Sequence, residues 1–231
     1  MKTIGMIGGM SWESTLEYYR IVNQEVKARL GGLHSAKCLL YSVDFEEIEK
    51  LQHESRWEEA GEVLSRVAQD LERGGADFIL ICTNTMHKVA AEVEESVAIP
   101  LLNIADATAE KIKAAGVQKI ALLGTRFTME ENFYKGRLVD IFGLDVLVPS
   151  EPEMEVIHRV IYEELCLGKI DSNSRRKYID VIDRLVGEGA EGVILGCTEI
   201  GLLVKQEDTD VPLFDTTEIH ARAAVEYALT P

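Results

Sequence analysis

The sequence predicts an α/β protein of two similar lobes, each built on a parallel sheet flanked by helices, and three observations carry this prediction. Short apolar runs alternate with amphipathic stretches along the 231 residues, which is typical of parallel sheets with crossover helices. Several of these segments occur twice in the same order. The two copies also keep their spacing, because Cys82 follows Ile4 by 78 positions and Cys197 follows Ile120 by 77.

The expected strands are short apolar runs with β-forming residues, at 4–8, 38–43, 78–82, 101–104, 120–124, 146–148, 193–196 and 213–215. The stretch 57–73 is typical of the helices between them, because Trp57, Leu64 and Leu71 lie on one side at helical spacing. Residues 105–116 are expected to form a connecting helix and 217–229 the final helix. We therefore expect helices to cover the sheets.

The internal repeat sets the architecture. The first strand and its small-residue turn, 4–9, match 120–125, and the cysteine segment 75–83 matches 189–198. A proline-containing strand follows each, at 99–102 and 211–214. We expect one lobe over 1–105, completed by 212–231, and a second over 106–211, related by a pseudo-twofold axis. Each cysteine would end a parallel strand, where open α/β sheets present their sites, so an active site is expected in the interlobe cleft.

Composition excludes several classes of protein. The net charge of −16, from 40 acidic and 24 basic residues, argues against a nucleic-acid partner, because phosphate contacts require clustered Lys and Arg. The first strand begins at once without a signal peptide, and no apolar run reaches the length of about 18 residues that spans a bilayer. We therefore expect a cytoplasmic protein with no membrane partner, whose thiols stay reduced.

The four cysteines, Cys38, Cys82, Cys166 and Cys197, lack the spacing of a zinc or redox site, so no metal is expected. Two thiols on opposite faces of an α-carbon can remove a proton and return one to the other face, because a thiol near its pKa serves as base or acid. A single buried cysteine is usually a small core residue. The repetition of Cys82 and Cys197 favours catalysis, whereas Cys38 and Cys166 are interpreted as core.

Polar residues follow both repeated cysteines: Thr83, Asn84 and Thr85 after the first, Thr198 and Glu199 after the second. Hydroxyls, amides and helix-start N–H groups bind carboxylates, so these residues favour a ligand that carries a carboxylate. The loop 8–15 stands where many anion-binding turns lie, although it is neither GxGxxG nor a P-loop, and a plain helix cap explains it equally well. His87 is equally compatible with a pocket and with packing.

These motifs resemble the aspartate/glutamate racemase family over nearly the whole chain. The resemblance is carried by four segments, 8–15 (GGMSWEST), 82–87 (CTNTMH), 123–125 (LGT) and 196–201 (GCTEIG). It implies a two-lobed fold, a reaction without pyridoxal phosphate or metal, and a homodimer. It also implies Cys82 and Cys197 as the acid/base pair, with a substrate lined by Met10, Thr83, Asn84, Thr85, Thr125, Thr198 and Glu199.

One departure from the family concerns the substrate. Aspartate-specific relatives hold the second carboxylate with basic side chains, whereas the corresponding stretches here offer Gln52 with its neighbours and 162–164 (YEE). A Glu beside an anionic substrate is unfavourable, so aspartate alone is not expected, and glutamate or a broader set stays open. Other isomerases of the superfamily, such as hydantoin racemases and maleate isomerases, are alternatives, as is a noncatalytic amino-acid-binding protein.

Overall fold

The computed structural model describes residues 1–230 and divides into two compact units. The first is Met1–Ile104 together with the C-terminal segment from His220, and the second is Ala105–Ile219. The division differs from the expected boundaries over 212–219, because the strand there pairs within the second sheet. Pro231, which the expected first lobe included, lies outside the described residues.

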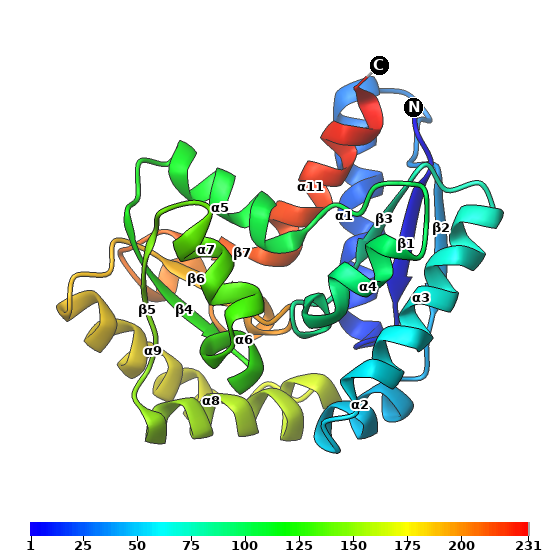
Figure 1. Ribbon diagram of the computed structural model, residues 1–231. Helices are drawn as coiled ribbons and strands as arrows, with labels where there is room; N and C mark the ends of the chain where they lie inside the picture. The colour runs from blue at the N-terminus through cyan, green and yellow to red at the C-terminus, as the bar shows by residue number, and fades with distance from the viewer. Residues whose placement is uncertain (231) are drawn as a thin grey trace. The chain divides into compact units, whose positions relative to one another are not determined.

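The first unit has a parallel sheet in the order β2-β1-β3, from Cys38–Ser42, Ile4–Gly8 and Phe78–Ile81. Alternate side chains of these strands enter two cores. Ile4 and Met6 pack against α1 (Trp12–Leu30) and α11 (Thr216–Leu229), whereas Ile7 packs against α3 (Trp57–Arg73). Figure 1 shows α3 on the side of β1 opposite to α1 and α11. The remaining helices of this unit are α2 (Phe45–His53), η1 (Thr85–Val89) and α4 (Ala90–Glu95).

The second unit has a parallel sheet in the order β5-β4-β6-β7, from Asp145–Leu147, Lys119–Gly124, Val193–Gly196 and Leu213–Asp215. The helices α8 (Glu151–Glu163) and α9 (Ser172–Gly187) contact β4. The other helical segments are α5 (Ile104–Ala114), α6 (Arg126–Glu130), the π-helix η2 (Asn132–Gly136), α7 (Arg137–Asp140), η3 (Leu165–Leu167), α10 (Ile200–Leu203) and η4 (Gln206–Asp208). The predicted α/β class, with parallel sheets flanked by helices, is confirmed.

The repeat predicted from the sequence extends to individual hydrogen bonds. Ile79 donates its N–H to the carbonyl of Pro100, and Val193 does the same to Pro212, both at 2.9 Å. The proline segment of the first unit makes only an isolated parallel bridge, between Leu101 and Ile79. The prediction of a strand over 101–104 is therefore confirmed only at Leu101 and is wrong for the residues after it, because α5 already begins at Ile104.

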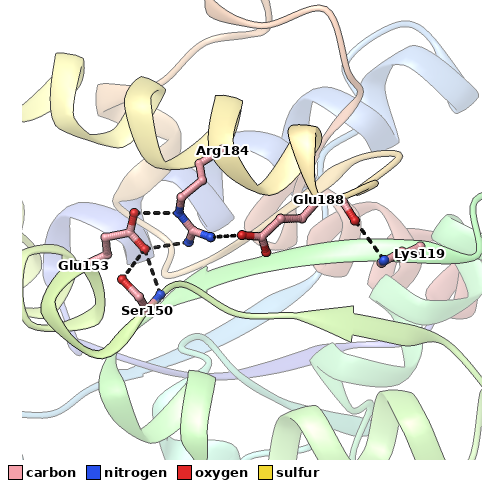
Figure 2. Close-up of polar contacts among 5 residues, drawn as sticks. All are labelled: Lys119, Ser150, Glu153, Arg184 and Glu188. Carbon is pink, nitrogen blue, oxygen red and sulfur yellow. Dashed lines mark hydrogen bonds and ion pairs between the residues drawn. The ribbon is translucent and has the colours of Figure 1, made fainter.

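An ion-pair network holds α8, α9 and β4 of the second unit together, as Figure 2 shows. Arg184 on α9 donates to both carboxylate oxygens of Glu153 on α8, at 2.7 and 2.5 Å, and also pairs with Glu188. Glu153 accepts the N–H of Ser150 and so caps its own helix. Lys119 at the start of β4 donates to the carbonyl of Glu188 at 2.9 Å. These contacts fix the helices that cover β4.

None of the helices in residues 1–230 is long and apolar enough to span a membrane.

Candidate functional site

In the first unit, Cys82 follows β3 directly and is fully buried. Its backbone N–H donates to the carbonyl of Ile7 on β1 at 2.9 Å, which extends the pairing of the two strands by one residue. Burial raises the pKa of the Cys82 thiol above its ordinary value. Thr83, Asn84 and Thr85 are buried as well and turn the chain into η1. The structure thus groups these four residues at the carboxyl end of β3.

The His87 side chain is hydrogen-bonded to the backbone of this turn. Ile104 donates its N–H to His87 Nε2 at 3.1 Å, so Nε2 accepts and Nδ1 carries the proton that it donates to the carbonyl of Thr83 at 2.8 Å. The ring is therefore a neutral, buried packing group with both nitrogens engaged. Of the two interpretations left open by the sequence, the hydrogen bonds favour packing.

Met10 and Gln52, which the family resemblance places beside the substrate, are both buried in the first unit. Met10 belongs to the apolar core on the α3 side of the sheet. Gln52 on α2 donates from Nε2 to the sulfur of Met86 at 3.0 Å. The loop after β1 is closed by Thr15, whose hydroxyl accepts the N–H of Gly9 at 2.8 Å. This loop caps α1 through Ser11, as the plain interpretation of the sequence expected.

In the second unit, Cys197 follows β6 in the same way, and Cys197, Thr198 and Glu199 are all buried. The carboxylate oxygen Oε2 of Glu199 accepts hydrogen bonds from the Cys197 thiol, at 2.9 Å, and from the Thr198 hydroxyl, at 2.8 Å. Burial raises the pKa of Cys197 well above its ordinary value, and the negative charge of Glu199 raises it further. The second thiol is thus held beside a buried carboxylate.

Thr125 follows β4 directly, and Ser11 follows β1 after two intervening residues. Each of them caps the helix that follows its strand. The Thr125 hydroxyl accepts the N–H of Thr128 at 3.4 Å, and the Ser11 hydroxyl accepts that of Ser14 at 3.3 Å. Capping hydroxyls of this kind satisfy helix-start N–H groups. Thr125 is buried and also lies 3.2 Å from the Thr128 hydroxyl.

Sequence reasoning missed the surroundings of the second thiol. Cys166 on η3, interpreted as core, is only half-buried, and its charge, when ionised, would raise the pKa of Cys197 and of the buried Tyr178 of α9. Glu164 belongs to the same group and accepts a hydrogen bond from Ser174 at 3.0 Å. Cys166 stands in an apolar helical stretch, so the local pattern holds no signal of this role. Within residues 1–230, no three His, Cys, Asp or Glu side chains are arranged to hold a metal ion.

Comparisons with known proteins agree on one family. The family model described as Asp/Glu/Hydantoin racemase matches residues 7–224. A crystal structure from Yersinia pestis, assigned provisionally to the Asp/Glu racemases, is 57% identical with a TM-score of 0.93, and both chains are covered completely. PH1733 from Pyrococcus horikoshii OT3, an aspartate racemase homologue, is 39% identical with a TM-score of 0.86, again over all of both chains.

A further relative carries a more specific name. The broad specificity amino-acid racemase RacX of Bacillus subtilis (strain 168) is 21% identical over an alignment of 234 positions, which covers 96% of this chain and 96% of RacX.

Proposed function

The chain belongs to the Asp/Glu/hydantoin racemase family, and from that premise we propose that it racemises an amino acid by moving protons between the substrate α-carbon and the thiols of Cys82 and Cys197, without a cofactor. One thiol, as thiolate, removes the α-proton from one face. The other thiol delivers its proton to the opposite face, which inverts the centre. The roles are exchanged for the reverse reaction, so both enantiomers are substrates.

The observation that supports this proposal best is the repetition of one arrangement in two units. In each, the strand next to the first strand, β3 or β6, ends at a buried cysteine that is followed by a buried threonine. A single buried cysteine is explained by packing, but packing does not require the same residue at the same strand end twice. Two-base racemisation does require two acid/base groups, one for each face of the α-carbon.

The polar residues around each cysteine suit the α-carboxylate and α-ammonium groups of an amino acid. Thr83, Asn84 and Thr85 in one unit, and Thr125 and Thr198 in the other, offer buried hydroxyl and amide groups, which donate to a carboxylate or accept from an ammonium. Met10 would contribute an apolar wall. Glu199, beside the second thiol, is the negative group of the set.

The proposed substrates are glutamate, aspartate or a broader group of amino acids. Gln52 supports breadth, because a neutral amide that donates to Met86 does not select for a second carboxylate as a guanidinium does. The similarity to RacX, a broad specificity amino-acid racemase, extends over nearly the whole of both chains and supports the same proposal.

Proton NMR in D₂O tests the function directly. The purified protein, without added cofactor, is incubated separately with L-Glu, L-Asp and a panel of neutral L-amino acids. Loss of the α-proton signal together with formation of the D-isomer is the expected result, and it identifies the substrate. Ligand binding without exchange would indicate a noncatalytic binding protein. Parallel incubations with a hydantoin and with maleate complete the test, and reaction of these compounds alone would indicate another branch of the family.

The proposal includes a homodimer in the cytoplasm. The chemistry requires both thiols to stay reduced, which suits that compartment. Light scattering of the purified chain tests the dimer: a mass near twice 25.7 kDa is expected, and the monomer mass at every concentration would contradict it.

A further inference from the structure

Both repeated cysteines are followed by a threonine, and the chemistry of the two copies differs at the next position. In the first copy, Cys82 and Thr83 are followed by Asn84, and in the second, Cys197 and Thr198 are followed by Glu199. A neutral amide therefore stands in one unit where a carboxylate stands in the other. Because both residues are buried, little water is present to screen the difference.

The Glu199 carboxylate is hydrogen-bonded to the second thiol. Its Oε2 atom accepts from Cys197 Sγ at 2.9 Å and from Thr198 Oγ1 at 2.8 Å. A thiol can donate this hydrogen bond only while it holds its proton, and a thiolate at the same place would face a carboxylate of like charge. The geometry therefore stabilises the protonated form of Cys197.

We propose that Glu199 is a positioning residue that keeps the proton on Cys197 in the resting protein, so that Cys82 is the thiol that ionises first. This inference rests on the proposed racemase function for its catalytic meaning. The Cys82 thiolate takes the α-proton of the first substrate, and the Cys197 S–H bond breaks as its proton passes to the opposite face of the carbanion. Cys197 is left as a thiolate beside Glu199. The resting state returns when Cys82 loses its new proton and Cys197 regains one, through solvent or through a substrate of the other enantiomer.

The surroundings of the two thiols support this asymmetry. Burial raises the pKa of both. For Cys197 the negative charge of Glu199 raises it further, and the carboxylate that carries this charge lies 2.9 Å from the thiol. The titratable groups that act on Cys197 thus oppose its thiolate, whereas burial alone accounts for the shift at Cys82.

The test is a pH titration of the four cysteines in the unliganded protein, labelled with ¹³C at Cβ, whose chemical shift reports thiol ionisation without needing a reagent to reach the buried sulfur. Resonances are assigned with Cys82→Ser and Cys197→Ser. In the wild-type protein we expect Cys82 to titrate at lower pH than Cys197. In Glu199→Gln, which keeps the size and an acceptor oxygen, the Cys197 midpoint should fall by about one pH unit or more, as expected when an adjacent like charge is removed.

Two variants separate charge from packing. Glu199→Asp retains the carboxylate and should leave the Cys197 midpoint close to the wild-type value. Asn84→Asp places a carboxylate at the matching position, two residues after Cys82, and should raise the Cys82 midpoint. If Cys197 in Glu199→Gln titrates no earlier than in the wild type, or if Cys197 titrates before Cys82 in the wild type, the proposal is overturned. The titration needs no turnover, so its failure is distinguishable from a failure of racemase activity.

Discussion

Tyr18 on α1 and His220 on α11 are joined by a hydrogen bond of 2.8 Å between the tyrosine hydroxyl and Nδ1 of the imidazole. His220 Nε2 lies 2.8 Å from the carbonyl of Leu102, which can only accept, so Nε2 carries the proton and Nδ1 accepts from Tyr18. Both nitrogens of a fully buried, neutral ring are thus used. The contact ties the C-terminal helix to the first helix of the same unit.

This arrangement predicts a loss of stability in mild acid. Burial lowers the pKa of His220 to about 4, so between pH 6.5 and 4 the unfolded chain binds a proton that the folded chain does not, and stability falls as the pH falls. A shift of this size corresponds to about 3 kcal/mol across that window. Urea unfolding at pH 7 and 4.5 measures it, with His220→Gln expected to show a smaller difference between the two pH values than the wild type.

The control is His53→Gln, because His53 lies at the exposed end of α2. This variant should retain the full pH dependence of the wild type. Equal slopes for the wild type and His220→Gln would contradict the prediction.

The proposed acid/base pair makes a sharper prediction. Cys82→Ser or Cys197→Ser should each reduce racemisation by about 10²- to 10⁴-fold, the range for loss of a positioned acid or base, because serine ionises too weakly to replace a thiolate. Cys38→Ser, which changes a half-buried thiol on β2, should keep the wild-type rate. Circular dichroism of D-isomer formation measures all three, and wild-type rates in both single variants would refute the two-thiol mechanism.

The ion pair between Arg184 and Glu153 predicts a modest, pH-dependent contribution to stability. Burial raises the pKa of Glu153, but Arg184 and Ser150 lower it by more, so the net pKa lies below its ordinary value. The contribution is therefore present above the unfolded pKa and is lost as the pH falls through the folded pKa. Arg184→Met keeps the aliphatic stem and should cost about 0.5–1 kcal/mol at pH 7, with a smaller cost at pH 3.

The matched control is the exposed pair of Arg66 and Glu62, whose charged atoms are 4.0 Å apart and whose side chains are 67% and 70% exposed. Arg66→Met should leave the free energy of unfolding unchanged within error at both pH values. An effect as large as that of Arg184→Met would show that burial and geometry do not distinguish the two pairs.

Much of the fold could be predicted because the sequence holds it twice. Periodicity located most of the strands, and the repeat predicted that each cysteine ends a strand, as β3 before Cys82 and β6 before Cys197 do. The repeat also holds in the pairing of the proline segments, because Leu101 bridges to Ile79 on β3 and β7 pairs with β6. The expected boundary placed 212–219 with the first lobe, whereas the structure groups these residues with the second unit.

Other parts of the site depend on contacts between residues that are distant in the sequence, and such contacts leave no local pattern. The bond from Ile104 to His87 joins residues 17 positions apart, and the contact of η3, which carries Cys166, with α10 joins segments far apart in the sequence. Neither has a periodic or motif signature. Glu199 stands two positions after Cys197 in the sequence, but that its carboxylate accepts from the thiol depends on the turn after β6.

The close approach of β4 and β6 predicts the cost of a single methyl group in the second unit. A Cβ atom added at Gly196 would lie 2.8 Å from the carbonyl oxygen of Leu123 and 2.9 Å from a methyl of Leu122. The backbone contact cannot be relieved by a rotamer change, so the strands would have to separate next to Cys197. Gly196→Ala should therefore reduce stability by about 1–3 kcal/mol, the range for overpacking.

Gly187→Ala is the matched control, because the last residue of α9 has open space for a Cβ atom, and alanine there should be neutral or stabilising by up to about 1 kcal/mol. Thermal unfolding of both variants decides the matter, and a Gly196→Ala protein as stable as the wild type would mean that β4 and β6 are less closely packed than the structure places them.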